Sequence, residues 1–160
     1  MHLKNWYKSA AATYFGKYAD YIKHDGSHTG NVGLGLCMTN HGLKYVSNAY
    51  KGGSGGVIFG DGDTEPIVDD YKLSGNLISG LSASVVQTQT VEDDYMEIEN
   101  VYTLTNTNTT EVTIREVAYC HQLSAYGVLM ERTVLDEPVT IPAGGVGQVT
   151  YTIRMNYPTA

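Results

Sequence analysis

Five histidines are the first side chains to consider for acid–base or metal chemistry: His2, His24, His28, His41 and His121. None stands in a His-Glu-x-x-His or comparable metal spacing, and no Gly-x-Ser-x-Gly nucleophile motif accompanies them. His24 and His28 are four residues apart, but they lie in a glycine-rich turn region rather than on one face of a helix. We therefore expect no catalytic residues, no metal site and no cofactor.

The two cysteines, Cys37 and Cys120, are far apart in sequence and match no metal-ligand spacing. Two readings stay open for them, a disulfide or a pair of small buried thiols. His121 follows Cys120 directly, and adjacent residues of a strand point to opposite faces. A thiolate–imidazolium pair is therefore not expected.

Carboxylates are concentrated in residues 61–70. Asp61, Asp63 and Glu65 have the spacing of calcium-loop ligands. The match fails where a calcium loop needs glycine and the chain has Pro66, and where it needs glutamate and the chain has Lys72. We expect a solvated acidic turn, and the alternative of a bound cation stays open.

Glu116 and Arg132 are candidates for a buried ion pair. Glu116 has the parity of Ile114 and Ala118 on an expected strand, so it points to the apolar face. A buried carboxylate needs a partner, and Arg132 lies among apolar residues of the next expected strand. We expect a structural ion pair that fixes the register of the two strands.

The elements that must position these residues are β-strands. From Tyr95 to Asn106, apolar residues alternate with Glu and Thr, a period of two that gives a half-buried strand. Further strands are expected, with a turn at 136–138, over 57–59, 77–86, 87–91, 112–121, 128–135, 139–141 and 148–157. Strands rich in Val, Ile, Thr and Tyr predict a mainly β fold, an antiparallel β-sandwich or jelly-roll with a short N-terminal amphipathic helix.

The helix is predicted for residues 2–15, where apolar residues recur at intervals of three and four. This stripe either docks on the sheet of its own domain or packs against a neighbouring subunit. In the second reading, the assembly interface consists of Leu3, Trp6, Tyr7, Ala10 and Tyr14.

Domain organisation follows from these elements. Residues 1–18 form an N-terminal helix or assembly arm, and residues 19–160 form one β-sandwich domain with a glycine-rich loop near 51–56. That loop is not a phosphate loop, because Val57-Ile58-Phe59 follows it as a strand rather than a helix. Residues 19–56 are either strand or an extended arm.

Charge and hydropathy restrict the partners. The chain has 160 residues, a net charge of −7 and a pI near 5.0, which argue against binding nucleic acid through its phosphates. No apolar stretch is long enough to span a bilayer, so membrane insertion is not expected. No signal peptide is apparent in residues 1–12.

Several blocks of residues resemble small virion structural proteins of tailed bacteriophages, which are often labelled tail, fibre or minor structural components. The blocks are Leu3-Lys4-Asn5-Trp6-Tyr7-Lys8, Phe59-Gly60-Asp61-Gly62, Asp69-Asp70-Tyr71-Lys72-Leu73, Val112-Thr113-Ile114-Arg115-Glu116-Val117, Arg132-Thr133-Val134-Leu135 and Pro138-Val139-Thr140-Ile141-Pro142-Ala143-Gly144-Gly145. Similar proteins commonly differ at Asp63, Glu65 and Ala118. The resemblance implies a multicopy part of a particle assembled in a bacterial cytoplasm, and it carries over no catalytic residues.

Two functions are therefore expected. The first is a non-enzymatic structural component of a bacteriophage virion, a tail, fibre or capsid-surface protein that self-associates and docks on other virion proteins. The alternative is a carbohydrate-binding or adhesin β-sandwich module that contacts a glycan of the host surface. In that case Tyr119 and Tyr126, near the loop at 122–127, are the candidate ligand-contacting residues.

Overall fold

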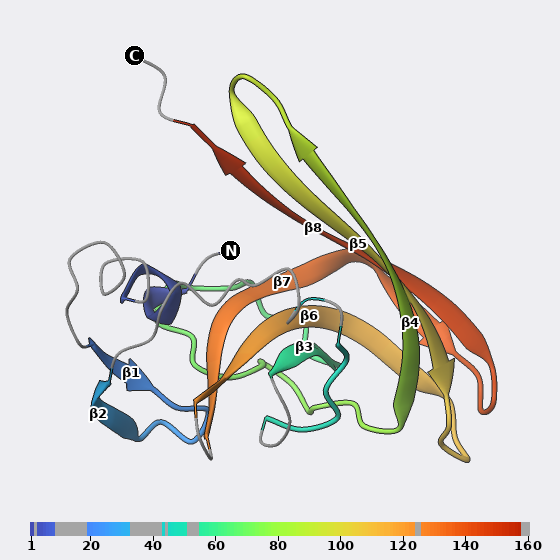
Figure 1. The fold of residues 1–160 in the computed structure, drawn as a ribbon. Coiled ribbons are helices and arrows are strands. Elements are labelled where there is room, and N and C mark those ends of the chain that lie inside the picture. Colours follow the sequence, from blue (N-terminus) through green and yellow to red (C-terminus); the bar gives the residue numbers. More distant parts are fainter. Residues whose placement is uncertain are drawn as a thin grey trace.

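The computed structural model describes residues 1, 3–8, 19–32, 43, 45–50, 55–123 and 126–157. For the strand residues 31, 32, 122, 123 and 126 it describes the backbone only. The fold is mainly β with one short N-terminal helix, as the sequence predicts (Figure 1). The helix is described at residues 4–8, and the rest of the predicted 2–15 helix lies outside the described residues or before residue 4.

The strands form two three-stranded antiparallel sheets and one hairpin, ordered β3-β6-β7, β4-β5-β8 and β1-β2. Their bounds are β1 Ala19–Ile22, β2 His28–Val32, β3 Gly56–Gly60, β4 Leu81–Val91, β5 Tyr95–Asn106, β6 Val112–Leu123, β7 Tyr126–Ile141 and β8 Val146–Asn156. Within residues 19–56, the hairpin β1–β2 shows that part of this region is strand, including residues 28–31, whose composition favours turns.

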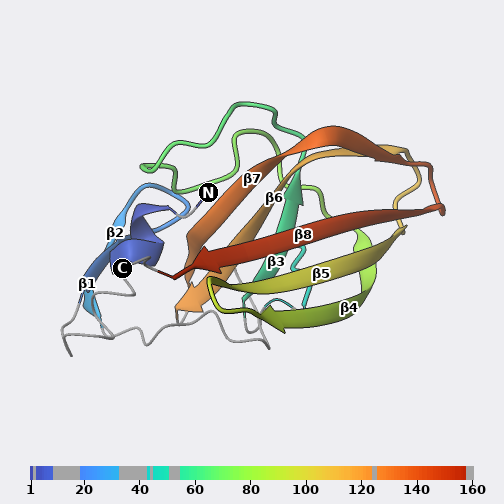
Figure 2. The same cartoon turned by 90° about the horizontal axis from the view of Figure 1, so that it is seen from above.

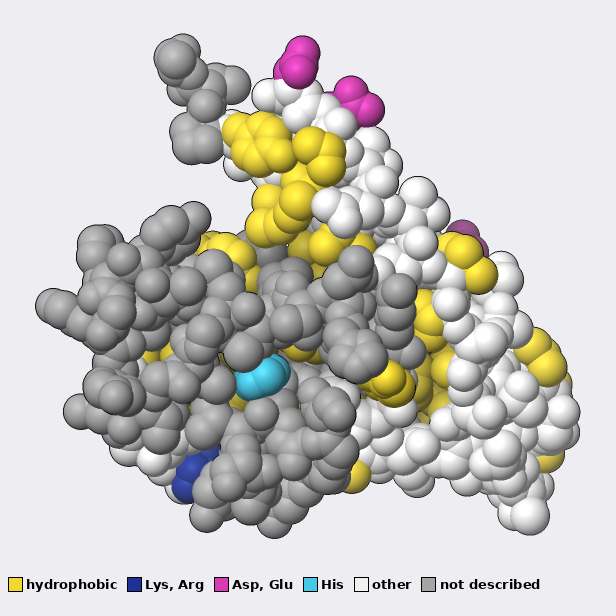
Figure 3. Space-filling model, viewed as in Figure 1, with side chains coloured by type: hydrophobic (Ala, Val, Ile, Leu, Met, Phe, Trp, Pro, Cys, Tyr) yellow, Lys and Arg dark blue, Asp and Glu magenta, His cyan; other side chains and the backbone are white. Residues whose placement is uncertain are grey.

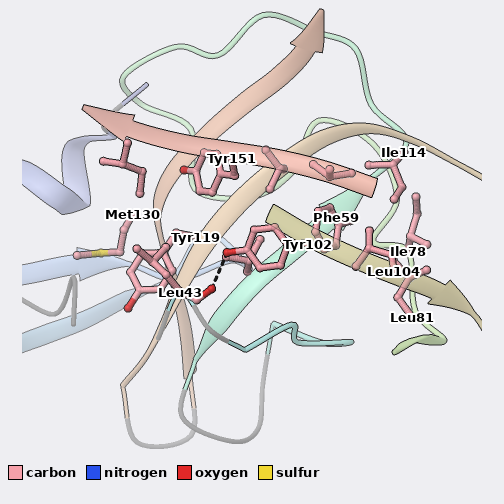
Figure 4. Packing of buried hydrophobic residues seen from close by; sticks show 14 of the residues in the cluster. Leu43, Phe59, Ile78, Leu81, Tyr102, Leu104, Ile114, Tyr119, Met130 and Tyr151 are labelled. Atoms are coloured by element: carbon pink, nitrogen blue, oxygen red, sulfur yellow. Dashed lines mark hydrogen bonds between the residues drawn. The ribbon is translucent and has the colours of Figure 1, made fainter. Parts of the chain in front are cut away.

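The main core lies between the two three-stranded sheets, which form the two layers of a sandwich (Figure 2). Phe59, Tyr119 and Met130 come from one sheet, and Tyr102 and Tyr151 come from the other (Figure 4). Period-two alternation explains this burial: along β5 the even-numbered residues from Ile98 to Asn106 are buried and the odd-numbered ones are half-buried. The predicted strand Tyr95–Asn106 is confirmed at both ends.

A second, smaller cluster covers the other face of the β3-β6-β7 sheet. It contains Leu3, Ile58, Leu73, Ala118, Cys120 and Leu129. The cover consists of the N-terminal residues and of the segment at 61–77, which runs along the side of this sheet opposite the β4-β5-β8 layer (Figure 2). β6 is therefore buried on both faces, which explains why residues of both parities from Glu116 to Cys120 are buried.

One predicted turn is wrong. Residues 136–138 do not separate two strands, because β7 runs unbroken from Tyr126 to Ile141. The turn-forming residues instead form a bulge, in which residues 135–138 lie opposite Arg115 alone. Pro138 is tolerated there because β7 is an edge strand and its outer side needs no ladder hydrogen bond.

One end of the β4-β5-β8 sheet projects beyond the rest of the molecule (Figure 1). It consists of the end of β4, the start of β5 and the end of β8, and we call it the projecting end. Val91 pairs with Met96, and Met96 pairs with Met155, across its three strands. The predicted strand over 77–86 begins only at Leu81, after which β4 continues without a break to Val91.

Candidate functional site

The densest polar site in the described residues is centred on the Glu116 carboxylate, and we call it the Glu116 network. Oε2 accepts hydrogen bonds from Arg132 Nε at 2.7 Å, from the Ser74 amide at 3.0 Å and from the Ser74 hydroxyl at 3.2 Å. Oε1 accepts from the Gly75 amide at 2.9 Å and the Gly62 amide at 3.2 Å. Glu116 and Arg132 are both fully buried, and the ion pair expected from the sequence is present.

The face on which this pair lies differs from the expectation. Ile114 faces the main core, but the strand register shifts between Ile114 and Glu116. After that shift Val117 and Tyr119 face the main core, whereas Ala118 lies in the second cluster. Glu116 therefore points toward the covering segment at 61–77 and not toward the other sheet.

Arg132 completes the network by tying the same segment to β7. Its guanidinium also donates to the Asp70 carboxylate and to the Thr64 carbonyl oxygen. Close packing of the segment depends on two glycines, since a Cβ at Gly62 would lie 2.0 Å from Ser74 Oγ and a Cβ at Gly75 would lie 2.3 Å from the Gly62 amide nitrogen. The network thus joins β6, β7 and the covering segment.

Electrostatics keep Glu116 ionised. Burial alone would raise its pKa, but hydrogen bonds from Arg132 and from the Gly75 and Ser74 amides outweigh burial and hold the pKa below its ordinary value. A carboxylate whose oxygens are occupied by five donors has little capacity left to accept a substrate proton. The arrangement is suited to positioning a loop.

Three carboxylates of the acidic segment, those of Asp61, Asp69 and Asp70, have partners within the chain. Asp61 accepts from the Asn76 amide at 2.6 Å and from its side chain at 3.1 Å, and these bonds lower its pKa. Asp69 pairs with Lys4 at 2.7 Å, and Asp70 pairs with Arg132. Among the described residues, no group of three or more His, Cys, Asp or Glu side chains could hold a metal ion.

The N-terminal stripe is divided between the core and the surface. Leu3 is fully buried in the second cluster, so it is unavailable to a neighbouring subunit, which corrects the reading of it as an interface residue. Trp6 packs partly buried against the main core. Tyr7 is 53 % exposed and makes an edge-to-face contact with Trp6 at 5.2 Å. Ala10 and Tyr14 lie outside the described residues.

Hydrogen bonds fix this N-terminal segment on its own domain. The Leu3 amide donates to the Met130 carbonyl oxygen at 3.0 Å, beside the edge strand β7. The buried Asn5 side chain donates to the carbonyl oxygens of Ile22 and Leu129 and accepts from the Ile22 amide at 3.0 Å. Residues 3–5 therefore behave as part of the sandwich.

The expected glycan-contacting pair is not assembled at the surface. Tyr119 is 1 % exposed and belongs to the main core, so it cannot stack on a sugar, which corrects that expectation. The side chain of Tyr126 lies outside the description. Tyr102 and Tyr151 are likewise core residues. The Tyr102 hydroxyl donates to the Leu43 carbonyl oxygen at 2.5 Å (Figure 4), and the Tyr151 hydroxyl donates to Glu131 at 2.9 Å.

Cys120 is a free, buried thiol of the second cluster. Burial raises its pKa to about 12, so the nucleophilic thiolate is scarce at neutral pH. Burial also lowers the pKa of the adjacent His121, which favours its neutral form. Cys37 lies outside the described residues.

Sequence reasoning missed the surface that the β4-β5-β8 sheet presents. On the projecting end, Val91 is 62 % exposed beside the half-buried Met96 and Met155. Figure 3 shows hydrophobic side chains continuing up this end, with acidic side chains at its tip. The signal was present in the sequence, since residues 81–91 include no charge, no proline and no glycine.

Comparison of the chain with protein families, with curated proteins and with solved structures found no match in any of the three. In the part of the chain that the structure describes, no helix has the length and apolar character needed to cross a membrane.

Proposed function

We propose that the chain is a non-enzymatic structural component of a tailed-bacteriophage virion, a tail, fibre or capsid-surface protein that self-associates and docks on other virion proteins. The observation that supports this proposal is the projecting end of the β4-β5-β8 sheet (Figure 1). The projecting end extends away from the layer that covers the rest of the sheet. Part of its surface is therefore not covered by that layer.

The chemistry of the projecting end suits docking on another protein. Val91, Met96 and Met155 form a row on the core-facing side of the sheet. The next pair on the same side, toward the body of the molecule, is Ile98 and Ile153, and both are buried. Methionine side chains are flexible and polarisable, and they adapt to apolar partner surfaces. On the opposite side, Arg154 pairs with Glu97 at 2.7 Å and lies 4.2 Å from the Tyr95 ring centre, which provides a polar rim.

The resemblance to virion proteins in the order of sequence blocks is the second support for this proposal. The alternative of a glycan-binding module loses one of its two candidate residues, because Tyr119 is in the core. We therefore do not propose it as a second function.

The test is whether the chain is part of assembled particles. Particles from an infected host, purified by density gradient and washed in high salt, are digested and analysed by quantitative mass spectrometry beside the soluble fraction of the same lysate. We expect peptides of this chain in the particle band at a fixed ratio to a known virion protein. Recovery in the soluble fraction alone would exclude the proposed role.

A further inference from the structure

We infer that two copies of the chain pair through their β4 edges, antiparallel about a two-fold axis at Val86, and so join their β4-β5-β8 sheets into one continuous six-stranded sheet. This inference rests on the self-association part of the proposed function and supplies its surface. The occupant of the edge is a second copy of this chain.

The first argument is that β4 is a long, regular edge strand. It runs from Leu81 to Val91, and β5 is its only strand partner in the described part of the chain. Its pairing with β5 shows no register shift from end to end. Most of its side chains are exposed, including Val86 at 69 %. A long, regular edge of this kind is a template for strand addition.

The second argument is that, in the described part of the chain, each other edge strand of the two three-stranded sheets has at least one feature that opposes pairing, whereas β4 has none. The edge strand β7 has a bulge at residues 135–138, with Asp136, Glu137 and Pro138. β3 has five residues, and isolated bridges to Val46 and Leu77 lie at its two ends. β8 presents Arg154. Charges, prolines and bulges are the usual means by which edges avoid pairing, and residues 81–91 have none of them.

The third argument concerns which backbone groups are free. The Gly80 carbonyl accepts from Thr107 and the Glu92 amide donates to Tyr95, so even-numbered residues direct their backbone groups toward β5. The Leu81 amide and carbonyl instead bond the Asn48 side chain, at 3.1 and 3.2 Å. Odd-numbered residues therefore face the free edge, and Asn48 closes its first position. In the described part of the chain, the groups left for a partner strand belong to Ala83, Val85, Gln87, Gln89 and Val91, and the last of these would lie opposite Leu81, whose groups Asn48 occupies.

The register follows from placing the two-fold axis at Val86, the most exposed apolar residue of β4. Pairing about Val86 sets each residue i opposite residue 172 − i, so Val85 faces Gln87 and Ala83 faces Gln89. These are the residues with outward N–H and C=O groups, and each pair can exchange two hydrogen bonds. Even-numbered residues of β4 in one copy lie opposite even-numbered residues of β4 in the other. The polar face of one β4-β5-β8 sheet therefore continues as the polar face of its partner. Val86 meets its own copy, which covers the most exposed apolar side chain of β4.

Charge selects the antiparallel arrangement. Each chain has a net charge of −7, and Glu92, Asp93 and Asp94 lie directly beyond β4. Antiparallel pairing about Val86 places these acidic turns at opposite ends of the joined strands, about 40 Å apart. That separation exceeds the screening length of about 8 Å at physiological ionic strength. Parallel pairing would bring the two acidic turns together.

The test uses charge at the two-fold axis. Val86→Lys and Val86→Glu place like charges directly opposite each other in the pair, while each exposed side chain remains compatible with the monomer fold. Light scattering over a concentration series is expected to give the wild-type chain twice its 17.4 kDa mass. Each single variant is expected to raise the dissociation constant at least about tenfold, and an equimolar mixture of the two is expected to restore the dimer.

Val146→Lys is the matched control, because Val146 is an exposed valine of β8 on the same sheet, and it should leave the mass unchanged. Hydrogen exchange gives a second readout. The amides of Ala83, Val85, Gln87 and Gln89 should be protected in the wild type and exchange fast in Val86→Lys, whereas those of Ser84 and Thr88 stay protected in both. A wild-type monomer at all concentrations, or a mixture that fails to dimerise, would overturn the inference.

This outcome is separable from the particle test. A dimer in solution that never enters particles would retain the β4 pairing and remove the virion role. A solution monomer that is present in particles would remove the β4 pairing and retain the virion role.

Discussion

At the scale of single residues, Glu116 shows how a buried charge can position a loop. The carboxylate holds three backbone amides of the covering segment and the Arg132 guanidinium at once. A buried ion pair of this kind is weak evidence for net stability, but removing one partner leaves the other charge uncompensated. The contribution of the Glu116–Arg132 pair to stability is therefore measured chiefly by changing one partner and leaving the other in place.

Glu116→Gln is expected to lower the free energy of unfolding by about 3 to 5 kcal/mol, because Arg132 keeps its burial and loses its main counter-charge. Urea denaturation followed by circular dichroism measures the change. The matched control is Glu97→Gln, which breaks the exposed pair with Arg154 and should cost about 1 kcal/mol or less. Equal losses for the two variants would contradict the role assigned to the Glu116 network.

The same residue predicts a pH dependence. The folded-state pKa of Glu116 lies below its ordinary value of 4.5. In the window between the folded pKa and 4.5, the unfolded chain binds more protons, so this contribution to stability is complete above pH 4.5 and is lost as the pH falls through the folded pKa. The wild type should therefore lose more stability than Glu116→Gln on acidification below pH 4.5. Parallel acid-denaturation curves would contradict the assignment.

At the scale of elements, the N-terminal segment is packed on the sandwich. Leu3→Ala is expected to destabilise the fold by about 2 to 5 kcal/mol, because it leaves a cavity in the second cluster. Tyr7→Ala, in the same predicted stripe but 53 % exposed, should cost about 1 kcal/mol or less. Thermal unfolding of both variants measures this difference, and a larger loss for Tyr7→Ala would refute the docking of residue 3 on its own domain.

The direction of the β4 backbone groups predicts how proline is tolerated. Thr88 directs its amide to β5, whereas the amide of Gln89 faces the free edge, and both side chains are exposed. Thr88→Pro should therefore be the more destabilising of the two by about 1 kcal/mol or more, since it removes a ladder hydrogen bond. Chemical denaturation compares the variants, and the reverse order would show that the edge is assigned to the wrong parity.

How much the sequence predicts depends on whether a feature is local. β5 is predicted at both ends because its alternation is uninterrupted. Residues 136–138 look like a turn because Asp136, Glu137 and Pro138 favour both turns and bulges, and only the pairing partner decides between them. For the same reason the Glu116–Arg132 pair is predicted but its face is not, because a register shift in β6 reverses the parity.

The predictions for Leu3 in the N-terminal stripe and for Tyr119 are wrong for a related reason. A helical or strand period identifies the apolar face of an element but not what covers it. Leu3 and Tyr119 are apolar or amphipathic residues in the right pattern for an interface, and the fold uses both in its own interior. The β4 edge is different. The sequence shows that residues 81–91 carry no charge, but only the strand order shows that they form an edge strand.

At the scale of the whole molecule, the residues that stabilise the fold lie in a different place from the surfaces that we propose for binding. The two hydrophobic clusters and the Glu116 network lie in the body of the sandwich, whereas the projecting end and the β4 edge lie at the margins of one sheet. Such a division lets the chain present surface for assembly without weakening its core. We propose that β4 joins the chain to its own copy and that the projecting end docks on other virion proteins.

The most direct test of this account is competitive incorporation into particles. Wild-type chain and Met155→Lys, which changes the projecting end on the β8 side and leaves β4 intact, are co-expressed during infection and quantified by mass spectrometry in purified particles and in the lysate. We expect the variant-to-wild-type ratio to fall at least about tenfold in particles, while Gln148→Lys on the opposite end of β8 enters like the wild type. An unchanged ratio for folded Met155→Lys would contradict docking through the projecting end.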